Sequence, residues 1–237
     1  MFNEELEPPK VQDVGGYTKP PSRYLIKALP SDFENFLENA GAYPALKVWK
    51  SVPGAYICGG AVRAYHNFKA NRPDVKVRDI DMYFVDNAAL HQARAGLTML
   101  GLKEVAETER AVTFIQRGYK PGPPIQLIRF VYGDLETILN EFDYTVIKLG
   151  ASLTEMVSHV DSEQDLADQV LRYCGSQLPL SSLARAIKYT RYGYKLPAGD
   201  LVAILKDIRE LVDLDDPSSM TGHITKSGDV GAVGSYE

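Results

Sequence analysis

The sequence of 237 residues lacks the features of secreted and membrane-spanning proteins. No apolar run approaches the length of a membrane span, and the acidic N-terminus has no signal-peptide character, so we expect no membrane partner. There are only two cysteines, Cys58 and Cys174, and they do not have the spacing of metal ligands. Cys58 lies in an apolar stretch and is expected to be a buried, reduced thiol, which fits a cytoplasmic protein.

The sequence also lacks an excess of positive charge. It contains 26 Lys and Arg against 31 Asp and Glu, which gives a net charge of −5. A protein that binds long nucleic acids is usually basic, because neutralisation of phosphates drives such binding. The composition therefore argues against a large RNA-binding surface, although it allows a small substrate or a locally basic groove. With 45% hydrophobic residues, the chain can form one sizeable soluble domain or a domain with a small helical appendage.

The chain divides into four segments by composition and periodicity. Residues 1–24 are rich in proline and glycine and predict an extended arm, and residues 217–237 are rich in Gly, Ser and Thr and predict a flexible tail. Residues 25–150 alternate strand and helix patterns and predict a head domain, and residues 151–216 predict a helical extension. A protein partner that orders the two terminal arms is an open alternative.

Periodicity and turn residues also predict the individual elements. We expect Ser31 and Asp134 to cap the helices that follow them. The predicted helices cover residues 32–39, 43–49, 61–70, 88–100, 135–140, 179–196 and 200–214, with helical pieces over 151–169. The predicted strands cover residues 55–58, 79–85, 103–107, 111–116, 125–131 and 142–147. Strands separated by helices indicate an α/β or α+β sheet domain.

The segment 56–86 carries the residues on which the functional interpretation depends. An apolar strand ends at Gly59-Gly60, and a helix pattern follows directly. Two glycines at such a turn allow a phosphate to approach the backbone closely, beside the positive N-terminus of the helix. The next strand contains Asp79 and Asp81, which lie on one face because side chains alternate along a strand. Two carboxylates on one face repel each other unless a cation lies between them, and Mg²⁺ prefers oxygen ligands.

This combination resembles the nucleotidyltransferase superfamily that includes DNA polymerase beta, and most closely the head domain of class II CCA-adding enzymes and poly(A) polymerases. The family motif G-G-x-V-R-D is matched by Gly59-Gly60-Ala61-Val62-Arg63, and its D-x-D motif by Asp79-Ile80-Asp81. The resemblance implies an α+β fold, a nucleotidyltransferase-type mixed sheet flanked by helices, with a short C-terminal helical extension. It also implies that Asp79 and Asp81 bind Mg²⁺, and that Gly59, Gly60 and Arg63 hold the triphosphate of an NTP such as ATP.

Two later stretches extend the resemblance to about residue 196. The segment 142–147 is similar to the family's R-R-D-F-T-I-N motif and implies an active-site role for Asp143, with structural hydrogen bonding as the alternative. The segment 183–194 is similar to L-R-A-x-R-F-x-x-x-x-G-F, which implies that Arg185 and Lys188 contact phosphate or the backbone of an RNA acceptor.

The predicted helix over 179–196 has two faces. Its basic stripe consists of Arg185, Lys188, Arg191 and Lys195, and its apolar face of Leu183, Ala186, Ile187 and Thr190. Four cations without an acid on one face are unusual in an acidic protein and favour an anionic ligand. The alternative is a solvated face whose aliphatic stems cover the core.

The sequence departs from the family pattern at several positions. Ala64 replaces the aspartate that ends V-R-D, and Gln126 lies on the strand that often supplies a third carboxylate, where it could bind only as a neutral ligand. Gln126 as an ordinary edge-strand or buried amide is the alternative. The base-reading motif E-D-x-x-R falls on Leu178, Pro179 and Ser182, none of which offers the paired donor and acceptor needed to read a base. The extended helices that hold tRNA are absent too, as in compact viral and phage proteins.

These observations lead to a main hypothesis and two alternatives. The main hypothesis is a Mg²⁺-dependent nucleotidyltransferase that transfers a nucleoside monophosphate from an NTP to a hydroxyl of RNA, of a protein or of a small molecule. The first alternative is a catalytically altered nucleotidyltransferase-fold module with a structural or interaction role, such as a component of a viral particle. The protein would then act in the host cytoplasm or in the virion. The second alternative is a sugar or antibiotic nucleotidyltransferase, which differs mainly in its acceptor.

Overall fold

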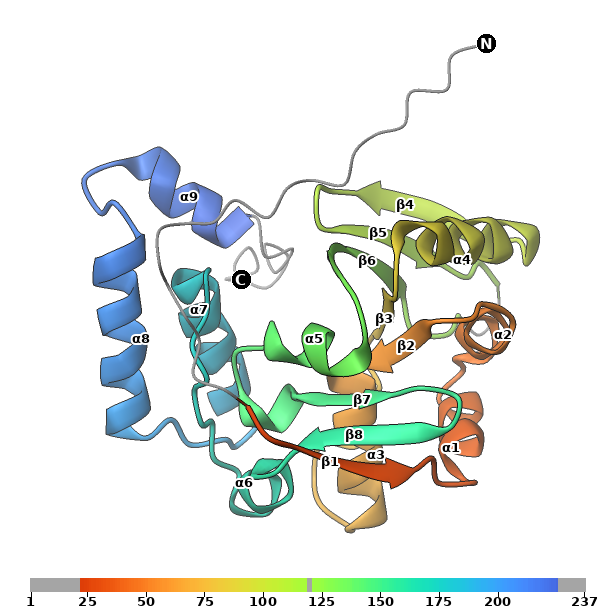
Figure 1. Ribbon diagram of the computed structural model, residues 1–237, viewed down its shortest axis with the longest axis horizontal. Helices are drawn as coiled ribbons and strands as arrows, with labels where there is room; N and C mark the ends of the chain where they lie inside the picture. Colours follow the sequence, from red (N-terminus) through yellow and green to blue (C-terminus); the bar gives the residue numbers. More distant parts are fainter. Residues whose placement is uncertain (1–21, 119–120, 226–237) are drawn as a thin grey trace.

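The computed structural model describes residues 22–118 and 121–225, which form an eight-stranded mixed sheet with helices around it (Figure 1). The strand order is β1-β8-β7-β2-β3-β6-β5-β4, and all neighbours are antiparallel except β3 and β6. The strands are β1 (Tyr24–Ala28), β2 (Ala55–Cys58), β3 (Ile80–Phe84), β4 (Lys103–Glu107), β5 (Ala111–Ile115), β6 (Ile125–Tyr132), β7 (Leu149–Ala151) and β8 (Glu155–His159). The predicted α+β fold with a mixed sheet is confirmed.

Nine α-helices and one 3₁₀ helix are present in the described residues. They are α1 (Phe33–Asn39), α2 (Tyr43–Ser51), α3 (Gly60–Lys69), α4 (Asn87–Met99), α5 (Leu135–Asn140), η1 (Thr145–Ile147), α6 (Ser162–Asp168), α7 (Pro179–Thr190), α8 (Ala198–Leu211) and α9 (Pro217–Thr225). None of the described helices is both long and apolar enough to cross a lipid bilayer.

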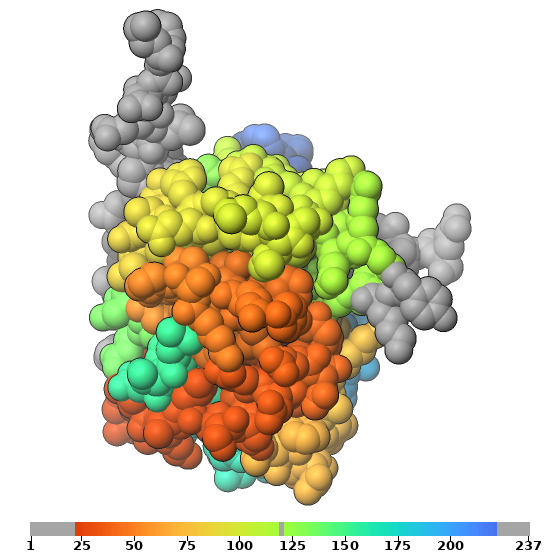
Figure 2. Space-filling view, turned by 90° about the vertical axis from the view of Figure 1, so that its right-hand side faces the viewer, coloured from red at the N-terminus to blue at the C-terminus, as the bar shows by residue number. Residues whose placement is uncertain are grey.

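The main hydrophobic core lies on the face of the sheet that α2, α3 and α4 cover. Ile57, Met82 and Leu127 lie side by side on β2, β3 and β6 and are fully buried. They belong to one cluster with Val62 of α3 and Leu97 of α4. Figure 2 shows α1, α2 and α4 forming a continuous outer surface over this side of the molecule. The two-residue alternation of β3 thus places Met82 on the core face and Asp81 on the opposite face.

The opposite face of the sheet is covered in part by the short helix α5. Asp134 caps α5 by accepting a hydrogen bond from the backbone N–H of Thr137 at 2.8 Å, as predicted. Gly150 permits the close packing of α5, because a Cβ atom there would lie 2.6 Å from Leu135 Cδ1 and 3.1 Å from Cys58 Sγ. Cys58 is a buried free thiol, which confirms its predicted environment.

The prediction for residues 142–169 is confirmed for α6 and wrong elsewhere. The predicted strand 142–147 is replaced by an isolated bridge at Tyr144 and a 3₁₀ helix over 145–147, because Tyr144 and Thr145 bond to residues 172–173 and not to a neighbouring strand of the sheet. Residues 155–159 form β8 instead of a helix, and this strand pairs with both β1 and β7. The sheet therefore continues past residue 150, where the head domain was expected to end.

Three smaller predictions are also corrected. Ser31 does not cap α1, which begins after Asp32; the Asp32 carboxylate accepts hydrogen bonds from Tyr65 and Lys69. Part of the predicted flexible tail, residues 217–225, forms α9. The buried face of α7 includes Ser182, Ala186 and Tyr189, whereas Ile187 is 51% exposed. The predicted arm and tail otherwise fall in residues 1–21 and 226–237, outside the described residues.

Candidate nucleotide and metal site

A tight turn connects β2 to α3 at the two glycines. Gly59 has a φ of +70°, a left-handed conformation that favours glycine, and its N–H donates to the carbonyl of Leu149 at 2.8 Å. Helix α3 begins at Gly60, so the N–H groups of its first turn have no acceptor within the helix. These groups, and not that of Gly59, are available to an anion.

Asp79 and Asp81 lie directly beside this turn. A Cβ atom on Gly60 would lie 3.6 Å from Asp79 Oδ1, and one on Gly59 would lie 3.9 Å from Asp81 Oδ2. The motif spacing predicts this arrangement. Side chains larger than hydrogen at the two glycines would therefore intrude on the space between the helix N-terminus and the carboxylates.

The two carboxylates have different surroundings. Asp79 precedes β3, is half-buried, and has neither an ion pair nor a side-chain hydrogen bond to any described residue. Asp81 lies within β3 and pairs in register with Cys58 on one side and Gln126 on the other. The charge of Asp79 acts on Arg63 electrostatically, but no ion pair or side-chain hydrogen bond within the described residues holds its carboxylate, and this favours a bound cation at the site.

Gln126 occupies the place beside Asp81 that a third carboxylate would need. The register continues from Gln126 to Thr113 of β5, so a polar row runs across three strands on the face that carries Asp81. The row has one carboxylate and two neutral side chains. Asp81 is therefore the one carboxylate of this row.

The oxygen donors at the turn suit a hard cation with an incomplete protein shell. They are the carboxylates of Asp79 and Asp81 and the amide oxygen of Gln126. Among the described residues, no group of three or more His, Cys, Asp or Glu side chains could hold a metal ion. Mg²⁺ fits this donor set, because it commonly binds one or two carboxylates and keeps waters and substrate phosphates as its other ligands.

Arg63 belongs to a buried cluster of charged and aromatic side chains. Its Nη2 lies 2.9 Å from Asp74 Oδ2, and the two side chains are only 4% and 5% exposed. Its guanidinium also lies over the ring of Tyr189, 4.9 Å from the centroid. Asp74 in turn pairs with Arg78 at 2.7 Å. The predicted contact of Arg63 with a triphosphate would therefore require this buried cluster to open.

Asp143 and Arg185 are brought together by the fold. Arg185 Nε donates to Asp143 Oδ2 at 2.9 Å, with side chains 26% and 3% exposed. A second bond joins the same segments, because the hydroxyl of Tyr144 donates to the carbonyl of Ser182 at 2.7 Å. Lys188 lies one turn further along α7 and is half-buried. Asp143 therefore orients Arg185, and the part of either residue in binding substrate stays a prediction.

Sequence patterns missed the aromatic wall of the site. The rings of Tyr83 and Phe142 pack with centroids 5.5 Å apart, and Phe142 Cε1 would lie 3.1 Å from a Cβ atom on Gly59. The position of Tyr83, two residues after Asp81, places it on the carboxylate face. The signal was present in that spacing, but an aromatic residue in a strand has no specific functional meaning.

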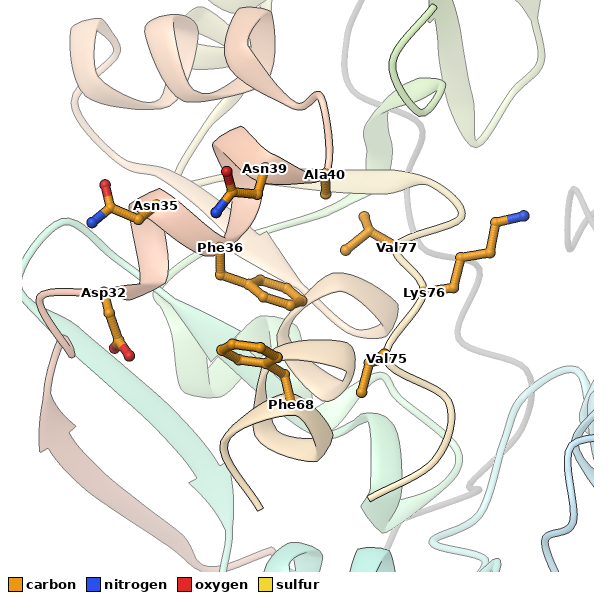
Figure 3. A pocket seen from close by; sticks show the side chains of 9 residues that line it. All are labelled: Asp32, Asn35, Phe36, Asn39, Ala40, Phe68, Val75, Lys76 and Val77. Atoms are coloured by element: carbon orange, nitrogen blue, oxygen red, sulfur yellow. The ribbon is translucent and has the colours of Figure 1, made fainter. Parts of the chain in front are cut away.

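A separate groove of about 550 Å³ lies toward the other end of α3 (Figure 3). Its apolar part includes Phe36 of α1, Phe68 of α3 and Val75 of the following loop, and Asn35 and Asn39 lie at its edge. None of the predicted site residues lines it. The groove is therefore distinct from the carboxylate site.

Comparison with known proteins identifies the family of this chain. The sequence profile of the Gabija anti-defense 2 (Gad2) family matches residues 27–169, which is more than half of the chain. The chain belongs to the Gad2 family. The matched region of this Gad2 protein contains the glycine turn, Asp79, Asp81 and Asp143, whereas Arg185 and Lys188 lie beyond it. No curated protein sequence matches this Gad2 protein.

Solved structures show the fold of the Gad2 protein. A CCA-adding enzyme in complex with ATP is 19% identical, with a TM-score of 0.59, over 85% of this chain and 51% of that one. The Thermotoga maritima CCA-adding enzyme complexed with tRNA is 18% identical, with a TM-score of 0.53, over 78% and 46%. A tRNA-processing enzyme is 20% identical, with a TM-score of 0.54, over 85% and 53%. The Gad2 chain thus spans about half the length of these enzymes and shares their nucleotidyltransferase fold.

Proposed function

We propose that this Gad2-family protein is a metal-dependent nucleotidyltransferase that transfers a nucleoside monophosphate from an NTP to a hydroxyl acceptor. The observation that carries the proposal is the position of two carboxylates, Asp79 and Asp81, beside a double-glycine helix N-terminus. The first turn of α3 offers N–H groups to phosphate oxygens, and the carboxylates offer ligands to a cation. A purely structural turn has no need of both features at one place.

The chain's own residues would act mainly by positioning and by charge. Asp79 and Asp81 would hold Mg²⁺, with Gln126 as a neutral neighbour. The bound metal would lower the cost of charge on the acceptor oxygen and on the pyrophosphate leaving group. Gly60 and the first turn of α3 would hold the triphosphate, and Arg185 and Lys188 of α7 would contact phosphate of the nucleotide or of an RNA acceptor.

The acceptor is proposed from the family name and from the departures in the sequence. Ser182, which falls in the base-reading motif of CCA-adding enzymes, is fully buried, and its hydroxyl donates to the carbonyl of Leu178. Reading of a base edge by this segment is therefore disfavoured. A family named for countering a defence system suggests an acceptor that belongs to that system, and we propose RNA or a protein side chain.

A second candidate function is an interaction module that counters the defence system by binding alone. It is favoured by the engagement of two predicted phosphate-binding cations, Arg63 and Arg185, with carboxylates of the same chain. The N- and C-terminal arms would then be further places for a protein partner to bind.

Labelling separates the two functions. The protein is incubated with each α-³²P-labelled NTP, Mg²⁺, and either total RNA or host lysate. Enzymatic function predicts a labelled RNA or protein with the wild type and none with the Asp79→Asn/Asp81→Asn variant, because the variant loses both metal-binding charges.

A matched control removes two charges elsewhere. Asp168 and Asp215 are exposed and lie outside the site, so Asp168→Asn/Asp215→Asn is expected to label at the wild-type level. No labelled product with the wild type in either mixture, or equal labelling by the site variant, would reject the enzymatic function.

A further inference from the structure

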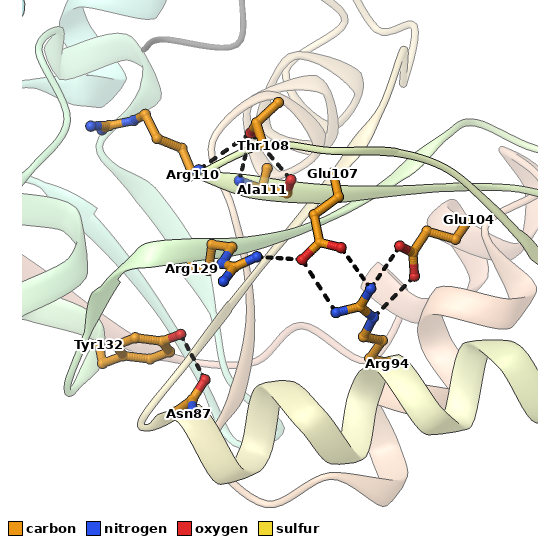
Figure 4. Close-up of polar contacts among 9 residues, drawn as sticks. All are labelled: Asn87, Arg94, Glu104, Glu107, Thr108, Arg110, Ala111, Arg129 and Tyr132. Carbon is orange, nitrogen blue, oxygen red and sulfur yellow. Dashed lines mark hydrogen bonds and ion pairs between the residues drawn. The ribbon is translucent and has the colours of Figure 1, made fainter. Parts of the chain in front are cut away.

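The two faces of the sheet differ in how their arginines are paired. On the face near α4, Arg94 forms ion pairs with Glu104 and Glu107, and Arg129 also pairs with Glu107 (Figure 4). Arg110, in the turn between β4 and β5, points away from this cluster in Figure 4. Within residues 22–118 and 121–225, no carboxylate lies within ion-pair distance of Arg110.

Arg110 is held in place by an aromatic ring. Its guanidinium lies over Phe130 of β6, 3.5 Å from the ring centroid. Phe130 packs with the second hydrophobic cluster, which contains Tyr83 and lies on the carboxylate side of the sheet. Stacking on a ring fixes the plane of a guanidinium and leaves its N–H edge available to an oxyanion.

The charge of Arg110 is costly where it lies. Burial lowers its pKa to about 10; the positive charge of Arg185 adds to this effect, and Tyr83 and Glu141 oppose it. The side chain remains protonated at neutral pH, so two cations repel each other across this face. An anionic ligand would relieve that repulsion.

The packing around Phe130 places Arg110 on the face of the proposed site. Strand alternation puts Phe130 on the face of β6 that carries Gln126, the register partner of Asp81. Phe142 packs against the same cluster as Phe130, lies beside Gly59, and directly precedes Asp143, the partner of Arg185. Arg110 and Arg185 converge on the same face from different elements, a hairpin turn and α7.

We propose that Arg110 forms a phosphate-binding subsite on the carboxylate face of the sheet, in which its guanidinium and that of Arg185 contact a phosphate group of the substrate. The subsite rests on the proposed function, since the phosphate belongs either to the nucleotide or to a nucleic-acid acceptor. A guanidinium can bind two oxygens of one phosphate through parallel hydrogen bonds, and the half-buried setting strengthens them.

Calorimetric titration tests the subsite with two probes that need no catalysis. One probe is inorganic tripolyphosphate with Mg²⁺, and the other is a single-stranded RNA oligonucleotide without a triphosphate. Arg110→Gln should weaken one of them by roughly tenfold, as expected for a lost charge-assisted contact. Arg110→Lys should retain part of the affinity, because it keeps the charge.

The matched control is Arg129→Gln, which removes a half-buried arginine from the neighbouring strand on the opposite face and should bind both probes as the wild type does. Thermal unfolding of each variant checks that the fold is kept. Weakening of tripolyphosphate binding assigns the phosphate to the nucleotide, and weakening of RNA binding assigns it to the acceptor.

The subsite is rejected if Arg110→Gln binds both probes like the wild type, if the wild type binds neither, or if Arg129→Gln weakens binding equally. Its failure is distinguishable from that of the proposed function. A wild type that labels an acceptor together with an unaffected Arg110→Gln variant rejects the subsite alone. If Arg110→Gln binds a probe more weakly than the wild type does, but the wild type labels no acceptor, the subsite is supported and the transferase function is rejected.

Discussion

At the scale of single residues, Asp74 sets the orientation of Arg63. Asp74 has a φ of +60°, in the left-handed region, and its carboxylate lies between the guanidinium groups of Arg63 and Arg78. Two further nitrogen atoms of Arg63, Nε and Nη1, are buried without a hydrogen bond among the described residues. The positive charge of Arg63 is therefore balanced by the Asp74 carboxylate and not by water.

We predict that Asp74→Ala lowers the free energy of unfolding by about 3–5 kcal/mol, because it leaves the buried Arg63 charge uncompensated. Urea denaturation of the variant and the wild type measures the change. Glu210→Ala is the control: its pair with Arg209 has side chains 57% and 76% exposed, and its loss should cost at most about 1 kcal/mol. Equal effects of the two variants would contradict the assignment of Asp74.

At the scale of elements, α7 is joined to the sheet domain through the segment that follows α5. The ion pair of Asp143 with Arg185 and the hydrogen bond from Tyr144 to Ser182 are polar contacts of this junction. Aromatic packing of Tyr144 against Tyr189 supports them, with centroids 6.5 Å apart. The position of α7, and with it Arg185, thus depends on residues from a different part of the sequence.

A double-mutant cycle measures the strength of this junction. We expect Asp143→Asn and Arg185→Gln each to destabilise the protein, with a coupling free energy of about 1–3 kcal/mol, since Asp143 is buried and Arg185 is partly exposed. Chemical denaturation of the four proteins gives the coupling. A coupling near zero would mean that Asp143 does not hold Arg185, and would favour a direct role of Asp143 in the site.

At the scale of the whole molecule, two histidines connect the sheet domain to α6. His66 Nδ1 of α3 lies 3.5 Å from Glu163 of α6, and its Nε2 is buried without a partner among the described residues. His159, at the end of β8, accepts a hydrogen bond from the N–H of Asp161 through Nδ1. Burial lowers the pKa of both histidines from their ordinary 6.5.

Because folding lowers the pKa of both histidines, the stability of the protein depends on pH. Above the unfolded-state pKa of 6.5, both histidines are neutral in either state and their contribution to stability is fully present. As the pH falls below that value, the unfolded chain binds protons that the folded protein does not, and stability is lost. We predict that thermal stability falls between about pH 7.5 and pH 5.5, and that His66→Gln/His159→Gln flattens the fall. Parallel melting curves across this range would contradict the prediction.

The extent to which the fold could be predicted varies with the range of the contacts involved. The helix over 135–140 followed from Asp134, because a cap bond closes within three residues. β8 could not be predicted, because it exists by pairing with β1, more than a hundred residues earlier in the chain. Residues 142–147 have a strand-like composition, but their backbone partners lie at residues 172–173 and impose another conformation.

The sequence by itself determined the local geometry of the candidate site. The double glycine fixes the turn, and the two-residue alternation of a strand puts Asp81 on the face opposite Met82, because both effects act over a few bonds. Only the tertiary structure decided which charges are available there. Asp74 pairs with Arg63 in the core, Asp143 holds Arg185, and Arg110 stacks on Phe130 without an ion pair to any carboxylate of the described residues. Such pairings depend on where separate segments meet, and burial then makes each of them costly to change.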